Sequence, residues 1–277
     1  MKSCVTISLV AEARGGPFVF WDDLIASIRQ AEEMGFDAIE IFPPSPDAID
    51  HQQLRGALAA SNLQLAALGT GAGWVRHQLT LTSADNAVRE EAIAFIRSII
   101  NAAAEFGAPA IIGSMQGRAT PEVPAPQARD YLRAALDVLG QAASERGVPL
   151  LYEPLNRYET NLCNTLADGV VLLESLQTDN VRLLADLFHM NIEECDIAAA
   201  FRQAGRHVGH VHFVDSNRRA AGLGHMTYGP IVRSLVDIGY QGYLSAEALP
   251  LPSSNEAALQ TIRAIHYWTA AARVAGN

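Results

Sequence analysis

Residues 181–186 have the sequence VRLLAD, a short apolar run that ends in an acidic residue. Three further runs carry an acidic residue or a histidine at or near their ends: PLLYE at 149–153, GHVHFV at 209–214 and GYLSAE at 242–247. Short apolar runs of this kind, bounded by turn residues, are typical of buried strands. We therefore predict four strands, each with a polar side chain towards its carboxyl end.

The first half of the chain contains four more runs of the same length. They are VTISL at 5–9, AIEIF at 38–42, LQLAAL at 63–68 and PAIIG at 109–113. Longer stretches with helical spacing lie between the strands, such as the apolar stripe Val88, Ala92, Phe95, Ile99, Ala103 and Phe106. Strict alternation of strand and helix predicts a parallel sheet, and eight such units favour a closed (β/α)₈ TIM barrel.

Residues that begin and end helices lie where this alternation requires them. Thr165 and Asp168 have the spacing of a capping box before an apolar helix. Helices are expected to stop and turn into a strand at Gly35, Gly107, Gly147 and Gly239. The alternative fold is a doubly wound open sheet, but GTGAGW at 69–74 follows the third strand and lacks the GxGxxG spacing.

The length and composition are those of a folded chain with a sizeable core. The 277 residues suit one barrel domain over 1–277, and no charge run or Pro/Ser-rich linker marks a boundary. A net charge of −10 argues against nucleic-acid binding, which depends on Lys and Arg. The odd cysteine count (Cys4, Cys163, Cys195) and the lack of a long apolar segment lead us to expect a soluble, cytoplasmic protein without a membrane segment.

Four strand ends together predict a metal site. Active sites of such barrels lie at the carboxyl ends of the strands, where the side chains of Glu153, Asp186, His212 and Glu247 would converge. Three buried carboxylates repel one another unless a cation neutralises them. An oxygen-rich ligand set with one histidine favours a divalent ion, with Mn²⁺ ahead of Mg²⁺ or Co²⁺.

Other polar residues near the predicted rim remain open. His210 faces the same side as His212, and we expect it to fill a lower layer of the barrel. His189 is expected in a loop above the sixth strand, as a ligand-binding or as a solvated residue. Arg118 is either an anchor for a substrate carboxylate or phosphate or a surface ion-pair partner. Trp74 and His77 either line the mouth or cover the core.

Four ordered motifs resemble the xylose-isomerase-like sugar isomerase/epimerase superfamily, and most of all its ketose 3-epimerase branch of tagatose, psicose and keto-sugar-acid epimerases. The motifs are LLYEPLNRYET at 150–160, LLADLFHMNIEE at 183–194, HVHFVDSNR at 210–218 and GYLSAEALPLP at 242–252. In GLGHMTYGP, Thr227 departs from the aspartate that the resemblance leads us to expect after the histidine. The departure bears on the rim of the site and therefore on the substrate.

The resemblance implies roles for individual residues. Glu153, Asp186, His212 and Glu247 match the ligands of one divalent metal ion, and Glu153 and Glu247 also match a catalytic acid/base pair. Glu159, His189 and Arg218 match residues that bind the carbonyl and hydroxyl end of the substrate. It also implies a homodimer or homotetramer.

These features predict a metal-dependent epimerase that inverts C3 of a ketose or keto-sugar acid by two-base proton transfer through an enediolate. On the same site, an aldose-ketose or hydroxypyruvate isomerase and an inosose dehydratase remain alternatives. A phosphodiesterase like endonuclease IV would need more metal ligands and a basic face. A non-catalytic sugar-binding barrel is disfavoured because both Glu153 and Glu247 are present.

Overall fold

The computed structural model describes residues 1–274, and its centre is a closed barrel of eight parallel strands. The barrel strands are β1 (Lys2–Ser8), β3 (Ala38–Phe42), β4 (Gln64–Gly69), β5 (Ala110–Ile112), β6 (Leu150–Tyr152), β7 (Val181–Asp186), β8 (Val208–His212) and β9 (Tyr243–Ala246). Pairing of β1 with β9 closes the barrel, with Lys2 opposite Tyr243 and Val5 opposite Ala246. The predicted (β/α)₈ barrel is therefore confirmed, and the open doubly wound sheet is excluded.

One short strand was not predicted. Strand β2 (Phe20–Trp21) lies outside the ring and pairs in parallel with Ile7 and Ser8 of β1. It follows a 3₁₀ turn, η1 (Ala11–Ala13), so the segment between β1 and the first helix folds over the end of the barrel. Phe18 in this segment packs against Phe42, with the ring centroids 4.4 Å apart.

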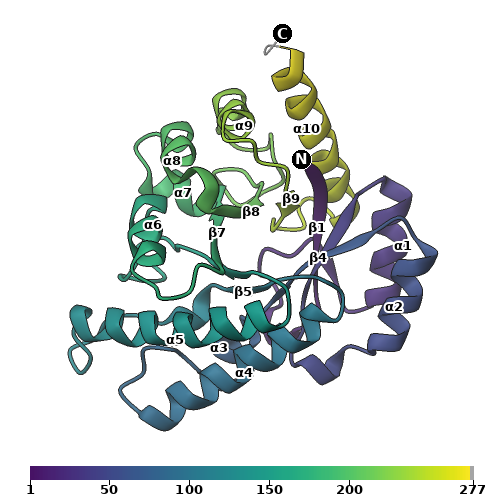
Figure 1. Ribbon diagram of the computed structural model, residues 1–277. Helices are drawn as coiled ribbons and strands as arrows, with labels where there is room; N and C mark the ends of the chain where they lie inside the picture. The colour runs from purple at the N-terminus through teal and green to yellow at the C-terminus, as the bar shows by residue number, and fades with distance from the viewer. Residues whose placement is uncertain (275–277) are drawn as a thin grey trace.

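Helices surround the barrel on its outside, and the last helix lies beside the first strand (Figure 1). The helices are α1 (Leu24–Met34), α2 (His51–Ala60), α3 (Ala72–His77), α4 (Asn86–Ala104), α5 (Ala125–Glu145), α6 (Leu166–Glu174), α7 (Leu187–Glu193), α8 (Ile197–Ala204), α9 (Tyr228–Asp237) and α10 (Ser254–Val274). Three further 3₁₀ turns are η2 (Pro46–Ala48), η3 (Ser114–Gln116) and η4 (Gly205–His207). No helix in the described part of the chain is long and apolar enough to cross a membrane.

Side-chain caps begin several helices, as the sequence suggested. The Thr165 hydroxyl accepts a hydrogen bond from the backbone N–H of Asp168, and the Asp168 carboxylate accepts one in return, which completes the predicted capping box. Asp23 caps α1 in a similar way, and Gly35 ends that helix with φ at 84°. Positive φ is costly for a residue with a Cβ, which explains glycine at this helix end.

The core has an inner and an outer part. Inside the barrel, Ala67, Ile111, Leu151 and Leu184 from four neighbouring strands form one small buried cluster. A much larger apolar cluster fills the space between the strands and the helices. Because the barrel is filled below, its carboxyl-terminal rim is the part open to a ligand. The expectation of one domain over 1–277 stays a prediction, and residues 275–277 lie outside the described residues.

Candidate active site and metal centre

Four predicted ligands meet at the carboxyl-terminal rim. Ligand atoms of Glu153, Asp186, His212 and Glu247 lie within 4.8 Å of one another, and all four residues are buried. The Nδ1 atom of His212 is 3.1 Å from Oδ2 of Asp186 and 3.3 Å from Oε2 of Glu247. Asp186 and His212 are the last residues of β7 and β8, while Glu153 and Glu247 directly follow β6 and β9.

The two oxygens of Asp186 serve different partners. Oδ1 accepts a hydrogen bond of 2.7 Å from the backbone N–H of Phe188 and so caps α7. Oδ2 faces the cluster, 3.1 Å from both His212 Nδ1 and a terminal nitrogen of Arg218. The helix start therefore fixes the carboxylate so that one oxygen remains directed at the site.

Space for the Glu153 carboxylate depends on a glycine in the neighbouring loop. A Cβ at Gly113, just after β5, would lie 2.6 Å from Oε2 of Glu153. Gln116 holds the backbone of Glu153 from the same side, because its side-chain amide donates to the Glu153 carbonyl at 2.9 Å. Any larger residue at position 113 would force this carboxylate away from the cluster.

The electrostatics of the cluster fit a bound cation. Burial raises the pKa of Glu153 well above its usual range, and the nearby Glu247 and Asp186 add to the increase. Burial opposes the charged form of His212, but Glu247 and Glu40 outweigh it and raise its pKa. Oε1 of Glu153 is buried and accepts no hydrogen bond from any described residue. A buried carboxylate oxygen that accepts no hydrogen bond and lies beside two other carboxylates fits a site for a divalent metal ion.

Arg218 comes from the loop after β8 and pairs with two carboxylates of the cluster. Its guanidinium donates to Oε2 of Glu247 and lies 3.1 Å from Oδ2 of Asp186. The backbone of Arg218 has a φ of 60°, a left-handed conformation that is uncommon for a residue with a side chain. Asp215 stabilises this loop, since its carboxylate accepts hydrogen bonds from the backbone N–H of Gly222 at 2.7 Å and of Met226 at 3.2 Å.

His189 faces a donor on each side of its ring. The backbone N–H of Asn156 and its side-chain amide both point at Nδ1 of His189, at 3.3 and 2.7 Å. A terminal nitrogen of Arg218 lies 3.3 Å from Nε2, and Oε1 of Glu153 lies 3.7 Å from the same Nε2. Burial lowers the pKa of His189 to about 3, so the ring is neutral near pH 7 and carries one proton. The two Asn156 donors favour that proton on Nε2, the nitrogen that faces Arg218 and Glu153.

The prediction for His189 was wrong in one respect. The residue is buried in α7, not in a loop, because Asp186 starts a helix directly after β7. Glu159 lies near it, with its carboxylate 3.8 Å from His189 Nδ1 and bonded to the Asn156 amide at 3.0 Å. The structure therefore brings Glu159, His189 and Arg218 to one side of the metal-ligand cluster. Asn156 lies within the motif at 150–160, but no pattern in the sequence marks it as a functional residue.

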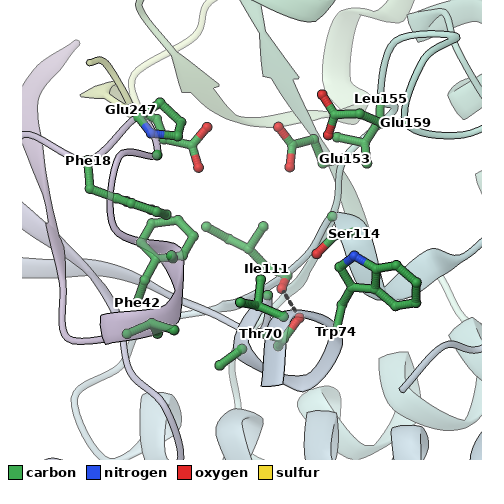
Figure 2. A pocket seen from close by; sticks show the side chains of 18 of the residues that line it. Phe18, Phe42, Thr70, Trp74, Ile111, Ser114, Glu153, Leu155, Glu159 and Glu247 are labelled. Carbon is green, nitrogen blue, oxygen red and sulfur yellow. Dashed lines mark hydrogen bonds between the residues drawn. The ribbon is translucent and has the colours of Figure 1, made fainter. Parts of the chain in front are cut away.

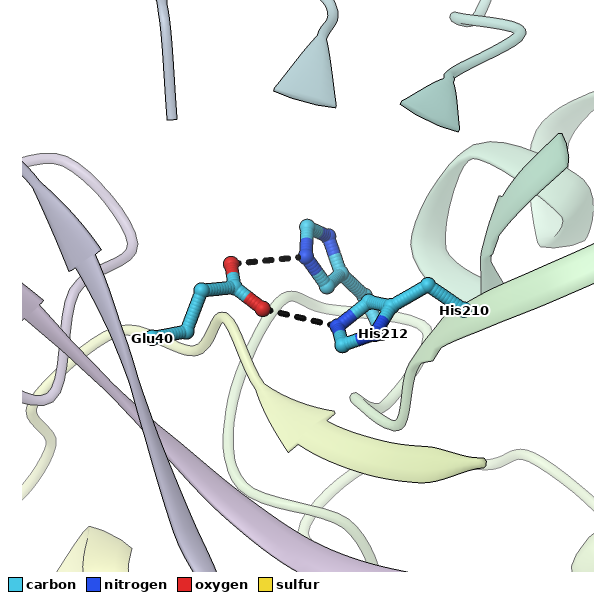
Figure 3. Close-up of side chains that lie close together, drawn as sticks. All are labelled: Glu40, His210 and His212. Atoms are coloured by element: carbon cyan, nitrogen blue, oxygen red, sulfur yellow. Dashed lines mark hydrogen bonds and ion pairs between the residues drawn. The ribbon is translucent and has the colours of Figure 1, made fainter. Parts of the chain in front are cut away.

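A buried glutamate below the cluster was also missed. Glu40 on β3 accepts from His210 Nε2 at 2.7 Å and lies 3.1 Å from His212 Nε2 (Figure 3). Its side chain is inaccessible to solvent, and His210 is buried beside it, one layer below His212 as expected. Burial alone would raise the pKa of Glu40, but the charge of His212 and the His210 hydrogen bond hold it well below its usual range. Glu40 therefore orients His212 from behind.

A pocket of about 370 Å³ opens above the cluster. Figure 2 shows the carboxylates of Glu153 and Glu247 on its upper side, with Phe18, Phe42 and Ile111 below and to one side. The pocket thus has one polar and one apolar wall. A sugar has hydroxyl groups and C–H faces, so both walls would find matching surfaces on such a ligand.

The remaining rim residues differ in whether they line the pocket. Trp74 of α3 lines this pocket, whereas His77 lines no described cavity and packs near Phe95. Arg118 is exposed and makes no surface ion pair within the described part of the chain. Thr227 is exposed at the start of α9 and is not among the residues that line the pocket. The departure at Thr227 therefore does not reach the pocket wall.

The fold and the residues at its rim place the chain in a known class of TIM barrel. A family model described as the xylose isomerase-like TIM barrel matches residues 28–266, and the chain belongs to this family. It is 32% identical over 230 residues to an L-ribulose 3-epimerase of Mesorhizobium japonicum, an alignment that covers 82% of this chain and 75% of the relative. A D-psicose 3-epimerase of Agrobacterium fabrum is also 32% identical, over 79% of this chain and 77% of its own.

Comparison with solved structures agrees. A structure of L-ribulose 3-epimerase superposes with a TM-score of 0.82 at 26% identity and covers 98% of this chain and 96% of the other. The resemblance inferred from the four motifs is thereby confirmed. The named relatives are epimerases, which are isomerases.

Proposed function

We propose that this protein is a metal-dependent ketose 3-epimerase. The observation that carries the proposal is the pair of carboxylates, Glu153 and Glu247, which both enter one pocket from its upper side and share a cluster with Asp186 and His212. Relatives at 32% identity over about four fifths of the chain are named as 3-epimerases of L-ribulose and D-psicose. The substrate class is therefore a ketose or a keto-sugar acid.

Inversion at C3 needs a proton removed from one face and returned to the other. In our proposal one of Glu153 and Glu247 takes the C3 proton, and the other gives a proton to the opposite face of the enediolate. Which glutamate serves which epimer depends on the direction of the reaction.

The other side chains would hold the substrate oxygens. In our proposal the ring proton of His189 is on Nε2, which lies 3.3 Å from a terminal nitrogen of Arg218, and a substrate oxygen beside both nitrogens would accept a hydrogen bond from each. Glu159 would accept from a substrate hydroxyl next to them. The apolar wall with Phe18 and Phe42 would exclude water from the reacting face.

Glu153, Asp186, His212 and Glu247 would together hold one divalent ion, for which we propose Mn²⁺, with Mg²⁺ and Co²⁺ as alternatives. When bound, such an ion polarises the substrate carbonyl and offsets the negative charge that develops on its oxygen. We also propose that the protein works in the cytoplasm, as a homodimer or homotetramer, without a nucleic-acid partner.

The test uses protein stripped with a chelator and reloaded with Mn²⁺. The reloaded protein is incubated with D-fructose, D-tagatose and L-ribulose, and the products are separated by chromatography. The proposal predicts C3 epimers that form only after reloading. Aldoses in place of epimers would favour the aldose-ketose isomerase, and no product from any ketose would reject the proposal.

A further inference from the structure

A second cavity, of about 690 Å³, adjoins the pocket. The two cavities share Trp74, Ser114, Leu155 and Glu159 as lining residues. In Figure 2 these four side chains lie together on the side of the pocket opposite Phe18 and Phe42. A ligand seated beside Glu153 can therefore extend past this wall into the second cavity. Ligand pockets usually measure about 300–1,000 Å³, so the second cavity has room for a group of its own.

The lining of the second cavity is rich in hydroxyl groups and has aromatic rings at its mouth. Four hydroxyl residues come from two loops: Thr80, Thr82, Ser83 and Thr120. Tyr158 is 76% exposed and Trp74 39% exposed, so both rings offer open apolar faces. Hydroxyl groups around a ligand, with an aromatic ring against a C–H face, are the contacts that a sugar ring makes.

Charge in the second cavity disfavours an anionic group. Arg118 is the single cation among its lining residues, against the carboxylates of Asp85, Glu122 and Glu159. Asp85 already accepts the backbone N–H of Ala87 at the start of α4. Within the described part of the chain, the side chains of Arg118 and Glu122 have no hydrogen-bond or ion-pair partner, so one donor group and one acceptor group remain available. A neutral polyhydroxylated group would use both, whereas a phosphate would be repelled.

We propose that the second cavity is a subsite for a glycosyl group, so that the preferred substrate is a ketose that carries a second, neutral sugar ring on one of the carbons beyond the reacting C3. The inference rests on the proposed function, because the reacting end occupies the pocket beside Glu153 and Glu247. It assigns Arg118, Glu122 and the cavity hydroxyls to the second ring.

The test compares D-fructose with three keto-disaccharides, maltulose, lactulose and isomaltulose, on the Mn²⁺-loaded protein. Affinity is measured by isothermal titration calorimetry, and epimer formation by NMR. We expect at least one disaccharide to bind at least tenfold more tightly than D-fructose. Ala84→Trp, which places an indole in the second cavity, should reduce this preference at least tenfold. Ala87→Trp is the matched control, because Ala87 is exposed on α4 and lines neither cavity.

Each outcome decides one of the two proposals. If a disaccharide binds more tightly than D-fructose and Ala84→Trp abolishes this difference in affinity, the subsite is supported. This holds even when no sugar is epimerised and the 3-epimerase proposal fails. If D-fructose is epimerised and no disaccharide binds more tightly than D-fructose, the subsite proposal is overturned and the 3-epimerase proposal stands. A preference that both tryptophan variants reduce equally also overturns it, because the loss is then unrelated to the cavity.

Discussion

The Nε2 atom of His212 lies 3.1 Å from Oε1 of Glu40, on the ring edge opposite to Nδ1, which faces Asp186 and Glu247. A histidine that donates one ring N–H to a carboxylate keeps its other nitrogen free to bind a metal ion. Glu40 thereby links the inner layer of the barrel to the metal-ligand cluster at its rim.

We predict that Glu40→Gln weakens Mn²⁺ binding by about 10- to 100-fold, the effect usual for outer partners of metal-bound histidines. The glutamine keeps the shape but loses the charge that holds His212. Calorimetric titration of the stripped protein measures the change. Glu105→Gln is the control, because Glu105 also pairs with a histidine, His51 at 3.1 Å, but on the surface. Equal affinities in wild type and Glu40→Gln would contradict a role for Glu40.

Metal removal should lower thermal stability. Glu153, Asp186 and Glu247 repel one another when no cation is bound, and an ion at 100 times its Kd stabilises the folded state by about 2.7 kcal/mol. For a chain of this size the Tm should fall by about 5–10 °C after chelation. Differential scanning calorimetry with and without Mn²⁺ measures it. Asp186→Asn should show little response to Mn²⁺, and an unchanged wild-type Tm would speak against a metal at this cluster.

The proton on His189 can be observed directly. Because Asn156 donates to Nδ1, we predict the Nε2–H tautomer in ¹⁵N NMR spectra of histidine-labelled protein near pH 7. Asn156→Asp replaces a donor by an acceptor and should shift the proton towards Nδ1. We expect epimerisation by this variant to fall at least about tenfold, since the pocket then loses a donor. An Nδ1–H tautomer in the wild type would refute the assignment.

Acid should destabilise the loop that carries Arg218. Burial would raise the pKa of Asp215, but hydrogen bonds from the backbone N–H of Ser216 and Gly222 hold it below the usual value. The unfolded chain therefore binds the proton more readily, so the stabilisation is complete above about pH 4 and is lost as the pH falls through the lower, folded pKa.

Asp215→Asn should accordingly cost about 1.5–3 kcal/mol of unfolding free energy at pH 7. The difference from wild type should shrink below about pH 4, as measured by urea unfolding across the pH range. Asp47→Asn serves for comparison, because Asp47 is exposed and its side chain has no hydrogen-bond partner in the described part of the chain. A deficit independent of pH would show that the carboxylate charge is not the cause.

The barrel and the convergence of Glu153, Asp186, His212 and Glu247 could be predicted because each signal is local. Asp186 ends an apolar run, Glu153 and Glu247 follow one, and strands in a closed parallel barrel bring such positions to one rim. The sequence also predicted helix ends, such as the end of α1 at Gly35 and the start of α6 at the capping box of Thr165 and Asp168. Capping depends on residues that are neighbours in the sequence, so it can be predicted locally.

Other parts of the site depend on contacts between distant segments. Glu40 lies inside the apolar run of β3, and its partner His210 is 170 residues away, so no local pattern marks the pair. Asn156 and His189 meet across two successive strand-end segments, and no sequence pattern indicates their hydrogen bond. The second cavity needs three loops to come together around Arg118, which the sequence offered as an anchor for a substrate carboxylate or phosphate or as a surface ion-pair partner.

Incorporation of deuterium at C3 tests the central claim most directly. Mn²⁺-loaded protein is incubated with a ketose in deuterated water and followed by NMR, with Glu153→Gln and Glu247→Gln measured alongside. We predict epimer that carries deuterium at C3, and a loss of at least about 100-fold in each variant. Deuterium at C1 without epimer, or epimerisation that survives removal of either glutamate, would contradict a two-base 3-epimerase at this pocket.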